Sequence, residues 1–228
     1  MLSPVTQNLN RGCEQRIHQI FQNVNPESCP YTYNFHLHTV HSDGQLQPIQ
    51  LIEQATKIGL KDLAITDHHT ITGYKIAAQW LADRAAQIND PPVLWVGAEV
   101  TSQLLGTEVH ILAYDFYLDH PALEIYLQGE APAGAASYAE QVIAAIHQAR
   151  GVAVLAHPAR YKISAAQLIP AAAAIGIDGV ETYYSYNNHH PWQYSPIPCA
   201  EVKQLSDIYG LLNTCGTDSH GTDILRRL

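Results

Sequence analysis

The sequence has few basic residues, no long apolar run and no closely paired cysteines. Its 228 residues include 12 Lys plus Arg against 21 Asp plus Glu, for a formal net charge of −9 with His neutral. This acidic balance argues against a protein that coats nucleic acid generally, because such a surface would be basic. It leaves room for a small anionic substrate, since bound cations would reverse the local field.

Membrane insertion and secretion are not indicated either. No stretch has the continuous apolar length of a membrane span, and residues 1–7 lack the basic and apolar regions of a secretory signal. We therefore expect a cytoplasmic protein with no membrane contact and no stable protein partner. No C-x-x-C spacing occurs, so neither a zinc ribbon nor a redox pair is indicated. The cysteines, which we expect to be reduced, are Cys13, Cys29, Cys199 and Cys215.

From residue 31 onward, short apolar runs alternate with helical segments. We interpret residues 1–30 as an N-terminal extension packed on the outside, and residues 31–228 as one domain. Strands are predicted at 34–38, 62–66, 93–99, 108–114, 152–157, 179–183 and 211–216, and helices at 46–58, 72–87, 137–150, 164–175 and 199–209. This rhythm is typical of βαβ units with parallel strands. The predicted fold is α/β, a distorted (β/α)7-type barrel resembling a TIM barrel, with its site at the C-terminal ends of the strands.

The first predicted strand runs into the sequence H-L-H-T-V-H-S-D-G, residues 36–44. His36 and His38 are one residue apart on an extended chain, so both side chains point to the same side and can bind one ion. Asp43 adds a carboxylate at a turn. Neutral imidazole nitrogens suit zinc, iron or manganese better than calcium.

Residues that can bind metal recur at the ends of the later strands. Because a parallel barrel brings these ends together, we expect the side chains to share one pocket. They are Asp67, His68, Glu99, His110, His157, Glu181, Asp218 and His220.

Together these motifs resemble the PHP (polymerase and histidinol phosphatase) domain family over residues 31–228. The resemblance consists of the H-x-H…S-D-G block, T-D-H, an isolated Glu and His, A-H-P, and a closing G-T-D-S-H-G. The pattern is most similar to the stand-alone phosphoesterase branch, which includes enzymes acting on nucleoside bisphosphates and short oligonucleotides.

The resemblance implies two to three divalent cations, Zn, Mn or Fe, at a trinuclear metal site. It assigns the ligands to three groups: His36, His38, Glu99 and Asp218; Asp43, His68 and His220; and Glu99, His110 and His157. A metal-bridging hydroxide would be the nucleophile, with Glu99, Asp218 and His220 as catalytic residues.

Three other residues are predicted to bind substrate. Arg160 could contact a second phosphate or the leaving group, or be a surface arginine. His69 stands where T-D-H-D usually has its second Asp, and could donate a proton to the leaving oxygen. Tyr183, like its neighbours Tyr184, Tyr186 and Trp192, could stack on a base, or pack its loop against the barrel rim.

Three further polar residues are predicted to have supporting roles. Asn34, where the family often has Asp, and Asp67 are interpreted as orienting ligands, Asp67 by a hydrogen bond to His68 or another ligand. Glu181 is given a substrate or structural role.

The predicted function is a metal-dependent phosphoesterase. It would hydrolyse a phosphate mono- or diester of a small phosphorylated metabolite, a nucleotide or a short oligonucleotide. The alternatives are a histidinol-phosphate phosphatase and a non-catalytic metal-binding or polymerase-associated module. Filled ligand positions favour an enzyme, and the S-D-G form of the first motif disfavours histidinol phosphate.

Overall fold

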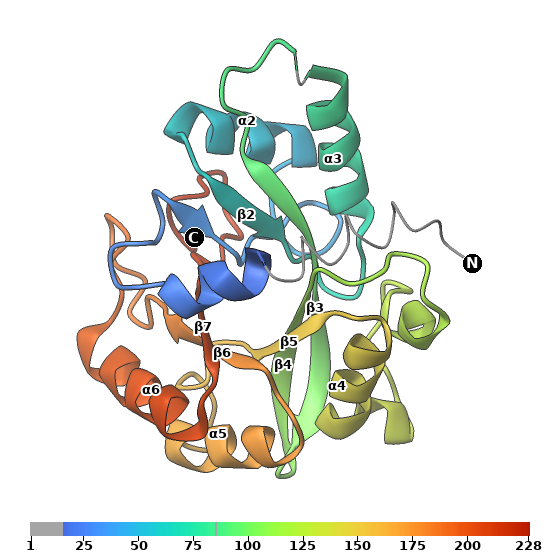
Figure 1. Ribbon diagram of the computed structural model, residues 1–228, viewed down its shortest axis with the longest axis vertical. Coiled ribbons are helices and arrows are strands. Elements are labelled where there is room, and N and C mark those ends of the chain that lie inside the picture. Colours follow the sequence, from blue (N-terminus) through green and yellow to red (C-terminus); the bar gives the residue numbers. More distant parts are fainter. Residues whose placement is uncertain (1–15, 85) are drawn as a thin grey trace.

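The computed structural model describes residues 16–84 and 86–228. Seven strands, hydrogen-bonded in chain order, curl into a nearly closed barrel with helices around it (Figure 1). The strands are β1 (Tyr33–Asn34), β2 (Asp62–Ile65), β3 (Val93–Leu104), β4 (Thr107–Tyr114), β5 (Val152–Leu155), β6 (Gly179–Tyr183) and β7 (Leu212–Cys215). The helices are α2 (Pro48–Ile58), α3 (Thr72–Arg84), α4 (Ala139–Gln148), α5 (Ala165–Ala174) and α6 (Pro196–Tyr209), with 3-10 turns η1 (Pro121–Tyr126) and η2 (Gly134–Ser137).

The chain beyond β1 closes the ring against the chain beyond β7. Phe35 N donates to Cys215 O over 3.0 Å, and Asp218 N donates to His36 O over 2.9 Å. The predicted α/β barrel is therefore confirmed. Closure brings the H-x-H motif beside the segment that follows β7.

The expectation that all strands are parallel is wrong at β4. This strand runs antiparallel to both β3 and β5, whereas the other neighbouring pairs are parallel. Leu105 and Gly106 link β3 to β4, and both have positive φ, 53° and 72°. Two residues can close a hairpin but cannot make the crossover between parallel strands. The first half of β4 therefore lies at the same end of the barrel as the C-terminal ends of the other strands.

Helix α2 fixes the loop between the first two strands. It starts with Pro48 and ends at Gly59, whose φ of 82° needs a residue without a side chain. Leu51 and Ile52 are fully buried in a cluster with Leu37 of the H-x-H motif. No helix in the described ranges is long and apolar enough to cross a membrane.

The described part of the predicted extension packs into the barrel. A helix at 16–23 (blue in Figure 1) buries Ile17 and Phe21 completely. The Phe21 ring lies 4.9 Å from the ring of Phe35 and 5.4 Å from that of Tyr114, centroid to centroid. These residues fill the end of the barrel opposite the C-terminal strand ends. The domain boundary at residue 31 stays a prediction.

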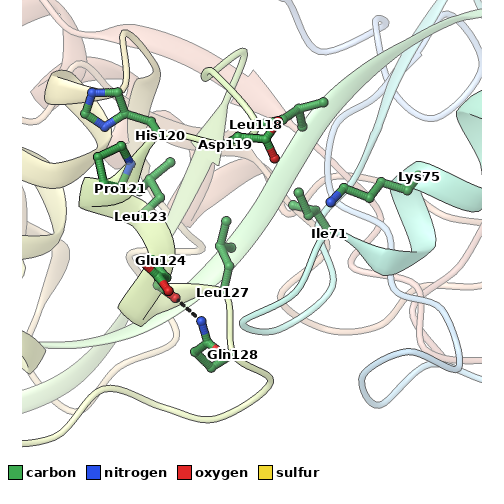
Figure 2. Close-up of a pocket in the computed structure, with 10 residues that line it drawn as sticks. All are labelled: Ile71, Lys75, Leu118, Asp119, His120, Pro121, Leu123, Glu124, Leu127 and Gln128. Atoms are coloured by element: carbon green, nitrogen blue, oxygen red, sulfur yellow. Dashed lines mark hydrogen bonds between the residues drawn. The ribbon is translucent and has the colours of Figure 1, made fainter.

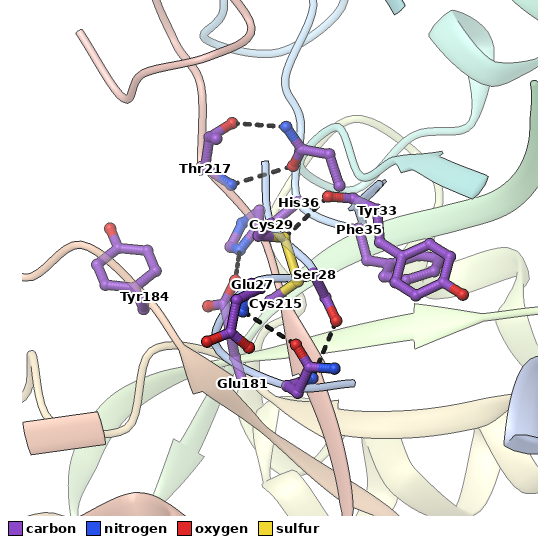
Figure 3. Close-up of a disulfide and its surroundings, with 12 residues drawn as sticks. Glu27, Ser28, Cys29, Tyr33, Phe35, His36, Glu181, Tyr184, Cys215 and Thr217 are labelled. Carbon is purple, nitrogen blue, oxygen red and sulfur yellow. Dashed lines mark hydrogen bonds and ion pairs between the residues drawn. A yellow bond between two sulfur atoms is a disulfide. The ribbon is translucent and has the colours of Figure 1, made fainter. Parts of the chain in front are cut away.

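The cysteines were expected to be reduced, and this is wrong for Cys29 and Cys215, which form a disulfide (Figure 3). The pair is separated by 186 residues, so only barrel closure reveals it. Cys199 is free and buried, and Cys13 lies outside the described residues. Disulfides are rare in the reducing cytoplasm, and the cytoplasmic location stays a prediction.

Candidate metal centre

The fold brings the predicted ligands together at the rim of the barrel. Three groups of side chains each offer donor atoms that lie within 4.8 Å of one another: His36, His38, Glu99 and Asp218; His38, Asp43, His68 and His220; and His68, Glu99 and His110. The first group has the predicted composition, and the second gains His38. The third includes His68 rather than His157, although Nε2 of His157 lies 3.3 Å from Oε1 of Glu99.

Glu99 lies at the centre of the cluster and is only 1% exposed. Five imidazoles surround its two oxygens: Oε2 is 2.9, 3.1 and 3.6 Å from Nε2 of His36, His38 and His68, and Oε1 is 2.7 Å from Nδ1 of His110 and 3.3 Å from Nε2 of His157. Burial alone would raise the pKa of Glu99. The imidazoles of His36 and His110 outweigh burial and hold the pKa well below its usual range. The ionised carboxylate of Glu99 thus contacts imidazole nitrogens with both of its oxygens.

Asp43 marks the open side of the cluster, with a side chain that is 52% exposed. Its Oδ2 lies 3.1 Å from Nε2 of His220 and 3.6 Å from Nε2 of His68. Burial tends to raise the pKa of Asp43, but the hydrogen bond from His220 and the other imidazoles lower it strongly. The cluster is therefore open to solvent on this side.

The donor set fits divalent cations. Nε2 of His38 is buried and has no hydrogen-bond partner, although it lies 3.1 Å from Oε2 of Glu99 and 3.3 Å from Oδ1 of Asp218. A buried nitrogen without a partner is unusual in proteins. Coordination of a cation would satisfy it, and imidazole with carboxylate is the donor chemistry of zinc, manganese and iron sites.

Glu181 orients two of the histidines. Its Oε1 lies 3.0 Å from Nδ1 of His36, and its Oε2 accepts the backbone N–H of His157 over 2.9 Å. A carboxylate on Nδ1 keeps the proton there and leaves the lone pair of Nε2 directed at the cluster. Glu181 therefore holds the His36 ring from the side opposite Nε2, and Figure 3 shows this contact.

Asp67 also has a supporting contact, but not with His68. It accepts hydrogen bonds from Thr39 N (2.6 Å), Thr39 Oγ1 (2.7 Å) and Ser42 Oγ (3.0 Å), and so fixes the loop that carries Asp43. A Cβ on Gly73 would lie 2.1 Å from Oδ2 of Asp67. Glycine at the start of α3 is thus required for this approach.

Asn34 holds the loop that carries Asp218. Its side chain donates to Thr217 Oγ1 and accepts from Thr217 N, both over 3.0 Å. Asp218 itself has φ of 54°, and His157 has φ of 28°. Positive φ in residues other than glycine costs energy and is concentrated at functional sites.

The three predicted substrate residues are placed differently. Arg160 lies at the rim, where its NH1 donates to Oδ2 of Asp218 over 2.9 Å. His69 is 4% exposed, with Nε2 3.0 Å from Oγ1 of Thr101. Tyr183 is 6% exposed and packs in the cluster that includes Cys29 and Cys215. A substrate role for these three residues stays a prediction.

Two contacts with Asp218 were not predicted from the sequence. The hydroxyl of Tyr184 donates to Oδ2 of Asp218 over 2.6 Å, and Nε of Arg227 donates to the same oxygen over 2.8 Å. Strand alternation from Glu181 predicts that Tyr183 faces the site, but the register shifts between Glu181 and Tyr183. For Arg227, nine positions after Asp218, no spacing rule provides a signal.

A separate cavity of about 340 Å³ lies on the flank of the barrel (Figure 2). Its lining is half apolar and half polar or charged, and comes from residues at the start of α3 and in and around η1: Ile71, Lys75, Leu118, Asp119, His120, Pro121, Leu123, Glu124, Leu127 and Gln128. None of the residues of the three candidate metal-binding groups lines it.

A barrel with clustered imidazoles and carboxylates at the C-terminal ends of its strands has the donor set of a metal-dependent enzyme. The PHP domain family model matches residues 34–167, and the chain belongs to this family.

Comparisons with single proteins give partial matches. A segment of 95 residues is 32% identical to the 5'-3' exoribonuclease Rnm of Salmonella typhimurium, covering 42% of this chain and 31% of that protein. The 5'-3' exoribonuclease of Haemophilus influenzae is 33% identical over 98 residues, 43% of this chain and 34% of its own length. The match thus spans about a third of each relative.

Solved structures share the fold at low identity. A Bifidobacterium adolescentis protein assigned by inference as a metal-dependent phosphoesterase has a TM-score of 0.69 at 22% identity, covering 85% of this chain and 89% of its own. An amidohydrolase of Chromobacterium violaceum, solved with sulfate and no metal, has a TM-score of 0.68 at 20% identity, covering 83% and 88%.

Proposed function

We propose that this protein is a metal-dependent phosphoesterase that hydrolyses a phosphate mono- or diester of a nucleotide, a short oligonucleotide or another small phosphorylated metabolite. The proposal rests on the position of Glu99 between two sets of histidines. Its Oε2 faces His36 and His38, and its Oε1 faces His110 and His157. A bridging carboxylate of this kind offsets the repulsion between neighbouring cations.

The residues that would hold two or three cations are those predicted from the sequence: His36, His38, Asp43, His68, Glu99, His110, His157, Asp218 and His220. Bound cations would supply a water of lowered pKa and would stabilise negative charge on phosphate oxygens. Glu181 keeps the lone pair of His36 Nε2 directed inward, and Asp67 keeps the loop of Asp43 in place. Exposed Asp43 leaves the cluster accessible to an ester from the rim.

The relatives named as 5'-3' exoribonucleases favour a short nucleic acid as substrate over histidinol phosphate. A net charge of −9 does not oppose this, because the cations would provide the local positive field.

The experiment is a hydrolysis screen of the purified chain with Mn²⁺, Zn²⁺ or Fe²⁺. Its substrates are p-nitrophenyl phosphate, its bis ester, histidinol phosphate, a nucleoside 3′,5′-bisphosphate and 5′-phosphorylated oligoribonucleotides. His110→Ala and Asp218→Ala should abolish turnover, while His18→Ala, on the helix at the opposite end of the barrel, should retain it.

Two outcomes would reject the proposal. Turnover retained in both the His110 and Asp218 variants would place catalysis elsewhere. Cation binding without hydrolysis of any substrate would favour the non-catalytic module.

A further inference from the structure

The two oxygens of Asp218 have different surroundings. Oδ1 faces the cluster, 3.4 Å from Nε2 of His36 and 3.3 Å from Nε2 of His38. Oδ2 points the other way and accepts three hydrogen bonds, from Tyr184 Oη (2.6 Å), Arg227 Nε (2.8 Å) and Arg160 NH1 (2.9 Å). With three donors on Oδ2, Oδ1 is the oxygen left for a cation.

Arg227 differs from Arg160 in how firmly it is held. Its side chain is 20% exposed, against 35% for Arg160. Its backbone oxygen accepts the N–H of His220 over 2.7 Å. One residue is thus joined to Asp218 by its side chain and to His220 by its backbone.

We propose that Arg227 is a positioning residue, whose Nε–H fixes Oδ2 of Asp218 so that Oδ1 is presented to a cation. The inference rests on the proposed metal centre. Outer partners of this kind orient the ligand, and their loss typically weakens metal binding by roughly 10- to 100-fold. The segment that follows His220 is then part of the metal centre.

Two substitutions separate the hydrogen bond from the charge. Arg227→Gln places an amide nitrogen three bonds beyond Cβ, where arginine has Nε, and so keeps a donor without the positive charge. Arg227→Met places a methyl group at the same distance and so removes both the hydrogen-bond donor and the positive charge. Arg226→Met is the matched control, since Arg226 pairs with Asp223 at 3.8 Å.

The primary measurement is Mn²⁺ binding to the metal-free full chain, with free Mn²⁺ followed by electron paramagnetic resonance. Arg227→Met should weaken the site that contains Asp218 by about 10-fold or more. Arg227→Gln and Arg226→Met should bind as the unaltered chain does. Tyr184→Phe removes another donor from Oδ2 and should weaken the same site.

Steady-state kinetics distinguish positioning from substrate contact. For a positioning residue, excess Mn²⁺ restores kcat in Arg227→Met, and KM for the ester is unchanged. If Arg227 contacts substrate, both Arg227 variants raise KM, Mn²⁺ does not rescue them, and the inference is overturned. Equal loss of Mn²⁺ affinity in the Gln and Met variants also overturns it, because the hydrogen bond would then not matter.

Failure of this inference is distinguishable from failure of the proposed function. If the unaltered chain binds no Mn²⁺, the metal centre itself is rejected. If it binds Mn²⁺ and Arg227→Met binds it equally well, only the role of Arg227 is rejected. Melting temperatures of all variants without metal show whether the fold is retained.

Discussion

Nδ1 of His110 lies 2.7 Å from Oε1 of Glu99, across the antiparallel pair of β3 and β4. Glu99 is directly opposite Leu112, so His110 is its diagonal neighbour on the same face of the sheet. A parallel β4 would have placed His110 near the other end of the barrel. The reversed strand is therefore the reason that these two residues meet.

Replacing Glu99 by Gln should eliminate the metal centre while preserving its shape. The amide lacks the negative charge that balances neighbouring cations, and its nitrogen cannot accept a bond from an imidazole. We expect the loss in Mn²⁺ affinity to exceed the roughly 10- to 100-fold typical of outer partners, with hydrolysis falling below detection. Equilibrium dialysis with elemental analysis measures the Mn²⁺ affinity, and an ester turnover assay measures hydrolysis. Wild-type stoichiometry and affinity in Glu99→Gln would contradict the bridging role.

Glu181→Gln tests orientation without touching a proposed ligand. Glutamine has one acceptor oxygen where Glu181 uses two, so either His36 Nδ1 or His157 N loses its acceptor. Mn²⁺ affinity should fall by roughly 10- to 100-fold, and excess Mn²⁺ should restore turnover. Glu201→Gln, exposed on α6, is the control. An unchanged binding isotherm for Glu181→Gln would show that His36 needs no such support.

The metal-free protein should lose stability as the pH rises from 7 to 9.5. Burial opposes protonation of His38, but the carboxylates of Asp218 and Glu99 outweigh it and raise its pKa to about 9. Between the ordinary pKa of 6.5 and about 9 the folded state binds more protons, so the free energy of unfolding falls with rising pH. The stabilisation that His38 contributes is thus complete below pH 6.5 and is lost as the pH rises to about 9 and beyond.

Urea unfolding in the presence of a chelator, at several pH values, measures this effect. A parallel series with saturating Mn²⁺ provides the control, because a coordinated His38 is already neutral and loses no proton between pH 7 and 9.5. A metal-free stability that stays constant or rises between pH 7 and 9.5 would contradict the prediction.

The Cys29–Cys215 bond should contribute substantially to stability. It closes a loop of 186 residues, and a disulfide that restricts the unfolded chain typically adds about 2–4 kcal/mol. Cys29→Ala combined with Cys215→Ala should lower the free energy of unfolding by that amount in urea. Reduced unaltered protein should match the double variant. If alkylation before reduction labels both cysteines in the native protein, the bond is absent.

Much of the barrel was predictable because short apolar runs, typical of buried strands, alternate along the sequence with helical segments. The clustering of the proposed ligands was predictable because parallel strands end at one rim, and His36 and His38 obey simple alternation. The reversal of β4 was missed because the hairpin turn of Leu105 and Gly106 lacks the common Asn-Gly signal. The contact of Tyr184 with Asp218 was missed because the register shift in β6 breaks alternation. Arg227 and the disulfide depend on closure between distant segments, which no local pattern encodes.

Ile17, Phe21 and Tyr114 fill the end of the barrel opposite the C-terminal strand ends, and this has a kinetic consequence. Under the proposed function, an ester would reach the histidine cluster on the exposed side of Asp43. The released alcohol, and the phosphate or phosphomonoester released with it, would leave by the same route. A phosphate-bearing product that binds the proposed cations would occupy the place of the ester. Its inhibition should accordingly be competitive, raising KM while the maximal velocity is preserved.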